Sequence, residues 1–169
     1  MDIFVANRCR RRIIAPAVLR RLARDVLTCA IAELELPSSQ VSVMFLGDPA
    51  MRRLNRHYRN LDKSTDVLSF AQSEGGDFPV PPGVPKPLGD VVISVETAER
   101  QASAARHSLE KEIAILLIHG LLHLTGYDDE KSESRRRMLS TQNRLLKHLE
   151  KDGSIFSAAP NSRRKKSKP

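Results

Sequence analysis

Two histidines stand four residues apart in the apolar stretch IHGLLHLTGYDDE, which covers residues 118–130. Side chains with this spacing lie on one face of a helix, so His119 and His123 can hold one metal ion together. The alternative is that two partly buried imidazoles simply hydrogen-bond to the backbone. Gly126 favours the metal site, because a glycine that ends the helix in the left-handed conformation turns the chain back toward that face.

The turn after Gly126 makes Asp129 the candidate third ligand, with Asp128 as a rival that the spacing favours less. Two histidines and one carboxylate leave a coordination position open, as in catalytic zinc sites, whereas a structural site needs a fourth protein ligand. The residue after the first histidine is Gly120, where metalloprotease helices carry the glutamate that serves as general base. This argues against peptide hydrolysis, and we expect the glycine to leave room beside the ion.

The elements that must position these residues follow from apolar periodicity and from capping residues. Strands are predicted at residues 2–7, 41–47, 65–70 and 88–95. Helices are predicted at residues 16–34, 49–59 after Asp48 as N-cap, 96–107, 108–126 with Ser108 as N-cap, and about 130–150. A Gly/Pro-rich loop covers residues 73–87. This order predicts a single α+β domain with a small mixed four-stranded sheet covered by helices, one of which carries the histidine pair.

Composition separates a folded domain, residues 1–150, from a short basic tail. The chain has 169 residues, of which 40% are hydrophobic and 28% charged, and no apolar run is long enough to span a bilayer. Two cysteines and no signal-peptide pattern favour the cytoplasm. Residues 151–169 carry six Lys or Arg and one Asp, and lack apolar periodicity. They are predicted to be a disordered tail that either solvates the terminus or binds polyanions.

Three segments resemble the YbeY family of endoribonucleases. HGLLHLTGYDD closely resembles the family's signature, NRHYRNLDKSTDVLSF at residues 55–70 resembles its Asn-x-x-Tyr-Arg-x-x-Asp-x-x-Thr-Asp-Val-Leu-Ser-Phe block, and LGDVVIS resembles the strand that follows. The resemblance implies a zinc-dependent endoribonuclease that cleaves single-stranded RNA and matures ribosomal RNA, including small-subunit end processing and quality control. Its partners would be ribosomal RNA and the small ribosomal subunit with its proteins. Whether water or a ribose hydroxyl attacks phosphorus is left open.

The resemblance departs from the family's pattern at the candidate site itself. The family usually has a third histidine where this chain has Asp129. A carboxylate is a legitimate zinc ligand, so one divalent ion per chain is still expected. Its negative charge makes the ion a weaker Lewis acid and widens tolerance toward harder ions such as manganese. A non-catalytic ribosome-assembly factor stiffened by its metal is therefore the alternative function.

Arg59 is the candidate catalytic residue, because the resemblance assigns the arginine of the 55–70 block to the active cleft. A guanidinium can donate two parallel hydrogen bonds to the charge that develops on phosphate oxygens. The alternative is a solvated basic face shared with other arginines of the same helix. Because the chain has no Trp and only 4% aromatic residues, we expect RNA binding through phosphates rather than stacking. The tail would contribute Arg163, Arg164, Lys165, Lys166 and Lys168.

Overall fold

The computed structural model describes residues 1–36, 38–72 and 79–151, and within these the expected α+β domain is confirmed. The elements in chain order are β1 (Asp2–Asn7), α1 (Pro16–Glu33), β2 (Ser39–Leu46), α2 (Asp48–Arg59), β3 (Val67–Ala71), β4 (Lys86–Ser94), α3 (Val95–Ala105), α4 (Leu109–Leu124) and α5 (Ser132–Lys151). None of the described helices combines the length and apolar character needed to cross a membrane. The predicted basic tail after Lys151 lies outside the described residues.

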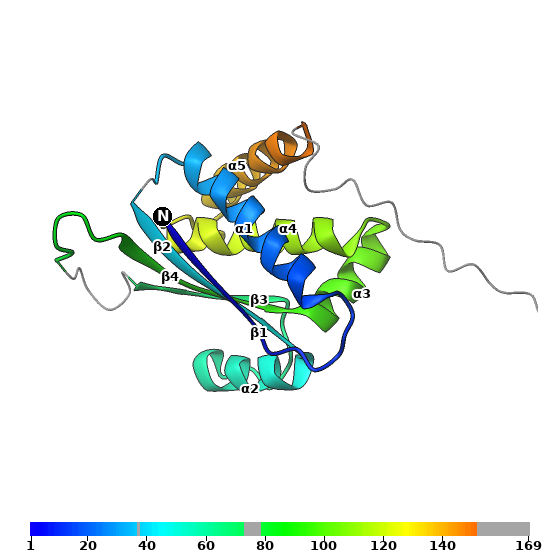
Figure 1. Ribbon diagram of the computed structural model, residues 1–169. Coiled ribbons are helices and arrows are strands. Elements are labelled where there is room, and N and C mark those ends of the chain that lie inside the picture. The colour runs from blue at the N-terminus through cyan, green and yellow to red at the C-terminus, as the bar shows by residue number, and fades with distance from the viewer. Residues whose placement is uncertain (37, 73–78, 152–169) are drawn as a thin grey trace, which may run out of the picture.

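The four strands form one mixed sheet in the order β1-β2-β4-β3 (Figure 1). β1 and β2 are parallel because α1 carries the chain back between them. β2 and β4 are also parallel, because β3 runs back along the sheet between them in the chain. β3 pairs antiparallel with β4 and forms the edge of the sheet. Alternate side chains of β3 therefore point to opposite faces at an open edge, which becomes important for the site.

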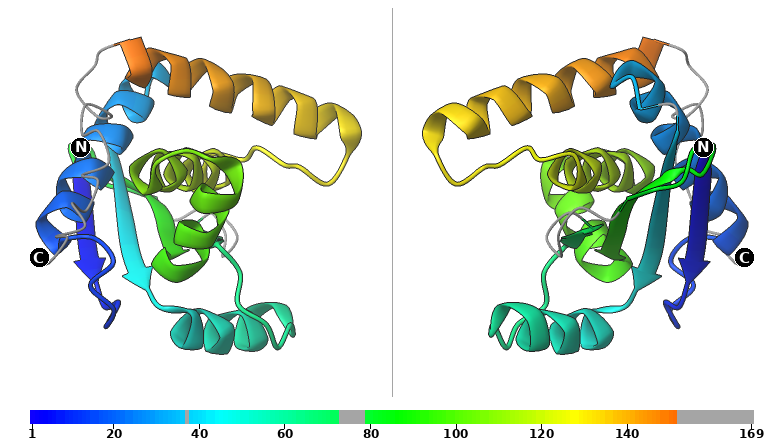
Figure 2. Two further views of the ribbon diagram at one scale, coloured as in Figure 1. Left: turned by 90° about the vertical axis from the view of Figure 1, so that its right-hand side faces the viewer. Right: turned by 90° about the vertical axis from the view of Figure 1, so that its left-hand side faces the viewer.

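Helices cover the two faces of the sheet unequally. α1, α4 and α5 lie on one side, and α2 lies on the other, as Figures 1 and 2 show. Val41, Val43 and Phe45 of β2 are buried in the main core with apolar residues of α1, α4 and α5. A smaller core beneath α2 contains four buried residues, Leu46, Met51, Leu68 and Val92. The single helix α2 leaves part of the second face of the sheet open.

Several element boundaries differ from the sequence-based expectation, each by at most two residues. β4 begins at Lys86 rather than residue 88, because the Lys86 N–H donates to the Ser38 carbonyl at 2.7 Å and extends the ladder with β2. α5 begins at Ser132, two residues later than expected. The other helices and strands agree with the prediction to within two residues at each end.

The expectation that Asp48 is the N-cap of α2 is wrong. Gly47 is the N-cap, and Asp48 lies in the first turn, where its carboxylate accepts hydrogen bonds from Ser94 Oγ and Thr97 Oγ1 and pairs with Arg100 Nη1 at 2.8 Å. Burial alone would raise the pKa of Asp48, but these hydrogen bonds lower it to about 2. The carboxylate thereby ties the start of α2 to β4 and α3, and so fixes the helix that carries the candidate arginine.

Candidate metal centre

The histidine helix α4 begins and ends as its sequence predicts. Ser108 caps the N-terminus by accepting a hydrogen bond from the Lys111 N–H at 3.1 Å. At the C-terminus, the Gly126 N–H donates to the His123 carbonyl and the Tyr127 N–H donates to the Leu122 carbonyl, both at 3.0 Å. Gly126 has a φ of 90°, so this is a Schellman motif that requires the left-handed conformation. The turn sends the following residues back past the face that carries the histidines.

The two imidazoles face each other through their Nε2 atoms, which are 3.1 Å apart. The other nitrogen of each ring has a separate partner: His123 Nδ1 lies 3.0 Å from the Tyr127 carbonyl, and His119 Nδ1 lies 3.2 Å from Gln142 Oε1. A carbonyl oxygen only accepts, so each Nδ1 carries the proton and donates it. In neutral rings, both Nε2 lone pairs are then directed into the same space.

This donor arrangement fits a divalent metal ion. Two unprotonated nitrogens facing each other at 3.1 Å repel unless a cation lies between them, and nitrogen ligands of a tetrahedral zinc ion lie about 3.3 Å apart. Burial, followed by the charge on a protonated His123, lowers the pKa of His119, so the neutral ligand form is favoured. The carbonyl partners of Nδ1 hold the tautomer that a metal site needs.

Asp129 is the aspartate that approaches the histidines. One carboxylate oxygen of Asp129 and one nitrogen of each of His119 and His123 lie within 4.8 Å of one another, and all three residues are half-buried. The rival, Asp128, is exposed and accepts a hydrogen bond from the Glu130 N–H at 2.9 Å, an interaction that shapes the turn. The structure therefore brings together the three residues that the sequence names as ligands.

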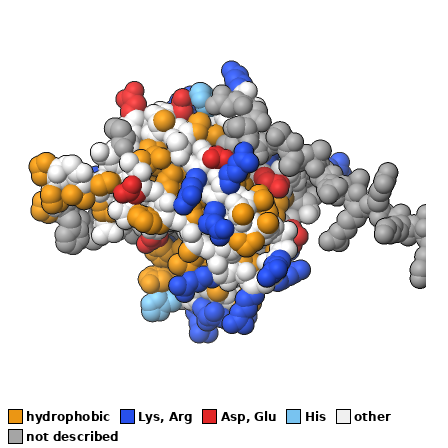
Figure 3. All heavy atoms as spheres, viewed as in Figure 1, with side chains coloured by type: hydrophobic (Ala, Val, Ile, Leu, Met, Phe, Trp, Pro, Cys, Tyr) orange, Lys and Arg blue, Asp and Glu red, His pale blue; other side chains and the backbone are white. Residues whose placement is uncertain are grey.

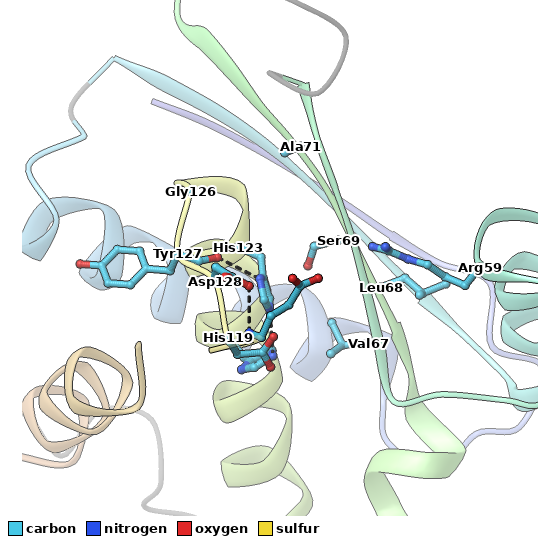
Figure 4. A pocket seen from close by; sticks show the side chains of 12 residues that line it. Arg59, Val67, Leu68, Ser69, Ala71, His119, His123, Gly126, Tyr127 and Asp128 are labelled. Carbon is cyan, nitrogen blue, oxygen red and sulfur yellow. Dashed lines mark hydrogen bonds between the residues drawn. The ribbon is translucent and has the colours of Figure 1, made fainter. Parts of the chain in front are cut away.

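Arg59 lines the same pocket, which has a volume of about 550 Å³. Figure 4 shows Arg59 reaching the pocket from α2, across β3 from the two histidines, with Ser69 between them. Among the described residues, Arg59 forms no ion pair, so its guanidinium is available to an anionic ligand. The pocket thus combines the candidate metal ligands with one cationic side chain supplied by a different element.

Gln142 of α5 is a functional residue that the sequence analysis missed. It is 8% exposed, and its side-chain oxygen orients the ring of His119. A signal for it exists in the sequence, because Gln142 occupies a polar position on the buried face of α5 between Met138 and Leu145. A buried amide in an otherwise apolar stripe needs a hydrogen-bond partner, and here that partner is a candidate ligand.

Gly120 does not leave room beside the ion, and that expectation is wrong. The residue is buried on the side of α4 that faces the sheet. A Cβ atom added to it would lie 2.6 Å and 3.0 Å from the two Val91 methyl carbons and 3.2 Å from Ser69 Oγ. The glycine instead allows α4 to approach β4 closely. This close packing sets the distance of the histidine pair from Arg59 across β3.

We predict that Gly120→Ala destabilises the protein, by about 1 kcal/mol net. Overpacking costs roughly 1–3 kcal/mol, and the better helix propensity of alanine returns about 1 kcal/mol. Rotation cannot relieve the clash, because both methyl groups of the fully buried Val91 are involved. Urea denaturation of the metal-free proteins measures the change in the free energy of unfolding.

A double-mutant cycle with Val91→Ala supplies the control for this prediction. Val91→Ala alone leaves a cavity, whereas in the Gly120→Ala background the new methyl group occupies part of that space. The loss in the double mutant should therefore be smaller than the sum of the two single losses. Additive losses, or a Gly120→Ala protein as stable as the parent, would contradict the packing argument.

Comparisons with known proteins identify the family. The family model described as Endoribonuclease YbeY matches residues 4–150. A protein named endoribonuclease YbeY from Geobacter metallireducens is 39% identical over 157 residues, which cover 92% of this chain and 100% of the relative. Its namesake from Heliobacterium modesticaldum is 48% identical over 118 residues, covering 67% of this chain and 71% of the relative.

A solved structure supports the fold independently. The solution structure of a Thermotoga maritima protein superposes with a TM-score of 0.62 at 22% sequence identity and covers 95% of this chain and 99% of its own. The sequence resemblance, the match of the family model to residues 4–150 and the two relatives agree. The chain belongs to the YbeY family.

Proposed function

We propose that this protein is a metal-dependent endoribonuclease that cleaves single-stranded ribosomal RNA. Its role would be small-subunit end processing, ribosome biogenesis and quality control, with the small ribosomal subunit and its proteins as partners. The curated relatives carry the name endoribonuclease YbeY, which supports this class of reaction. The observation that carries the proposal is the pair of Nε2 atoms 3.1 Å apart in a pocket that Arg59 also lines. Ribosomes act in the cytoplasm, and a chain with only two cysteines has too few for a disulfide framework, so we place the protein there.

His119, His123 and Asp129 would hold one zinc ion, and manganese is the alternative that the carboxylate admits. A bound divalent ion supplies a Lewis acid and lowers the pKa of water that it coordinates. The Tyr127 carbonyl and the side-chain oxygen of Gln142 keep the imidazoles oriented by accepting hydrogen bonds from Nδ1–H. Arg59 binds a non-bridging phosphate oxygen and stabilises the charge that builds on it during cleavage.

The experiment that tests the proposal is turnover of single-stranded RNA by rigorously purified protein. Cleavage should stop when a chelator removes the metal and return when zinc or manganese is added. A second candidate function, a non-catalytic ribosome-assembly factor, draws support from Asp129 at the position of the family's usual histidine. A protein that binds metal and RNA but never cleaves RNA would favour that alternative.

We predict that Asp129→His retains the ion and shifts the pH profile of cleavage toward lower pH. A neutral third ligand leaves one more positive charge on the site, so coordinated water loses its proton at lower pH. Asp129→Ala should weaken metal affinity strongly, because two ligands remain. Asp128→Ala is the matched control and should bind metal normally, since its carboxylate already serves the turn. If Asp128→Ala loses the metal and Asp129→Ala does not, the wrong aspartate has been assigned.

We predict that truncation from Ser157 onward weakens RNA binding without slowing cleavage at saturating RNA. The removed basic residues are Arg163, Arg164, Lys165, Lys166 and Lys168. Each lost phosphate contact reduces the log–log salt dependence of single-strand binding by about 0.7, so five contacts would lower it by up to about 3.5. Affinity titrations at several salt concentrations measure the slope. An identical slope for both proteins would mean that the tail only solvates the terminus.

A further inference from the structure

A second hollow lies on the opposite face of the sheet from the metal pocket. It has a volume of about 670 Å³ and lies where α2 leaves the sheet uncovered. Phe4, Tyr58 and Phe70 line it, so three of the seven Phe and Tyr residues of the chain meet in one place. The side chains of Phe4 and Tyr58 are exposed, and Tyr58 contacts Phe70 edge to face at 4.8 Å. We call this hollow the aromatic groove.

The floor of the aromatic groove is one row of residues across all four strands. Phe4 of β1 is paired with Ser42 of β2, Ser42 with Asp90 of β4, and Asp90 with Phe70 of β3. Neighbouring strands are about 4.8 Å apart, so the two phenylalanines lie about 14 Å from each other with polar groups between them. In RRM domains, aromatic rings on the face of a four-stranded sheet stack two or three bases of single-stranded RNA.

The aromatic groove and the metal pocket lie on opposite faces of the edge strand β3. Successive side chains of β3 point to opposite faces, so Ser69 lines the metal pocket and Phe70 lines the groove. The last turn of α2 repeats this division, because Tyr58 lines the groove and Arg59 lines the metal pocket. A polymer held at the metal pocket reaches the groove by crossing a single strand.

The charge around the aromatic groove suits a nucleic acid. Figure 3 shows hydrophobic side chains between the sheet and α2, with Lys and Arg side chains over α2 itself. Arg53 and Arg56 of α2 line a separate hollow and not the groove itself, so they add positive charge on the helix beside the groove. Asp90, the acidic residue in the floor, and Ser42 can accept hydrogen bonds from base amino groups.

We propose that the aromatic groove binds bases of the single-stranded RNA whose scissile phosphate lies in the metal pocket. The chain passes over the β3 edge, where Arg59 contacts a phosphate, and its unpaired bases stack on Tyr58, Phe70 and Phe4. This inference rests on the proposed function and deepens it, because it explains why the substrate must be single-stranded. Bases within a duplex are stacked and paired, so their faces cannot reach the rings. It also revises the expectation that the chain binds RNA through phosphates without stacking.

The test is binding of a fluorescein-labelled 12-nucleotide single-stranded RNA to the full chain, measured by fluorescence anisotropy, with the RNA shown to be intact by gel at the end. Phe4→Ala and Tyr58→Ala should each raise Kd roughly 10-fold, the typical cost of losing one stacked base. Tyr58→Phe keeps the ring and should bind as the parent does. Leu139→Ala is the matched control, because Leu139 is a similarly exposed apolar residue on α5.

Turnover separates this inference from a change at the metal pocket. Phe4→Ala should raise the KM for RNA cleavage, since Phe4 lies in the groove on β1, at the opposite edge of the sheet from β3. Leu139→Ala should cleave RNA as the parent does. Thermal melts check that the exposed substitutions leave the fold intact.

The outcomes distinguish the groove inference from the proposed function. If the parent cleaves RNA and both alanine variants bind RNA as tightly as the parent, the groove inference is wrong while the proposed function stands. The groove would then fit a protein partner instead. If Leu139→Ala weakens binding equally, the effect is unspecific and the inference also fails. A parent protein that neither binds nor cleaves single-stranded RNA would overturn the proposed function itself.

Discussion

His123→Ala protein is expected to lose its divalent ion and, with it, RNA cleavage. His123 is one of three candidate ligands, and its Nε2 faces that of His119 at 3.1 Å. Removing it leaves one imidazole and one carboxylate, which cannot hold zinc in a site that already has an open position. The loss of metal affinity should be larger than the roughly 10- to 100-fold loss that follows removal of a residue that only hydrogen-bonds to a metal ligand.

Elemental analysis after dialysis measures the metal content of the His123→Ala protein, and gel assays measure its RNA cleavage. His148→Ala is the matched control, because His148 lies on α5 outside the metal pocket. That variant should keep both the ion and the activity. Undiminished metal in His123→Ala would rule out this site. Loss of cleavage with full metal content would instead mean that His123 acts on RNA without holding the ion.

Local patterns predicted the parts of the site that are built from one stretch of chain. The spacing of His119 and His123 determines that they share a helical face, and Gly126 ends the helix through a motif formed by residues 122–127. The preference for Asp129 over Asp128 also followed from sequence distance, and the structure brings the same aspartate to the histidines. Asp129 follows Leu124, the last residue of α4, by five residues, so its position depends mainly on the local turn at Gly126.

The features that sequence reasoning missed depend on segments far apart in the chain. Gln142 contacts a histidine 23 residues away, and Gly120 is required by Val91 and Ser69 on two strands. Nothing near Gly120 in the sequence distinguishes a close helix–sheet contact from empty space beside an ion. The aromatic groove is a further example, because Phe4 and Phe70 share a row only when the strand order β1-β2-β4-β3 is known.

Arg59→Ala protein is expected to cleave RNA about 100-fold more slowly, or worse, while its metal content and fold stay unchanged. The arginine lines the metal pocket but is neither a metal ligand nor an ion-pair partner of another described residue, so its loss removes charge stabilisation and little else. A well-placed donor to developing negative charge commonly contributes that factor to the rate. Single-turnover cleavage at saturating RNA measures the rate without interference from weaker binding.

Two further variants test whether cleavage needs a guanidinium at position 59 or only positive charge on α2. Arg59→Lys keeps the positive charge but loses the planar pair of donors, so its rate should fall between those of the parent and Arg59→Ala. Arg53→Ala removes an arginine from the same helix outside the metal pocket, and its single-turnover rate should equal that of the parent. Equal cleavage rates for Arg59→Ala and Arg53→Ala would mean that Arg59 has no role in cleavage and simply belongs to the solvated basic face of α2. A specific loss at Arg59 would mean that the turn of α2 supplying Tyr58 to the aromatic groove also delivers the charge that cleavage needs.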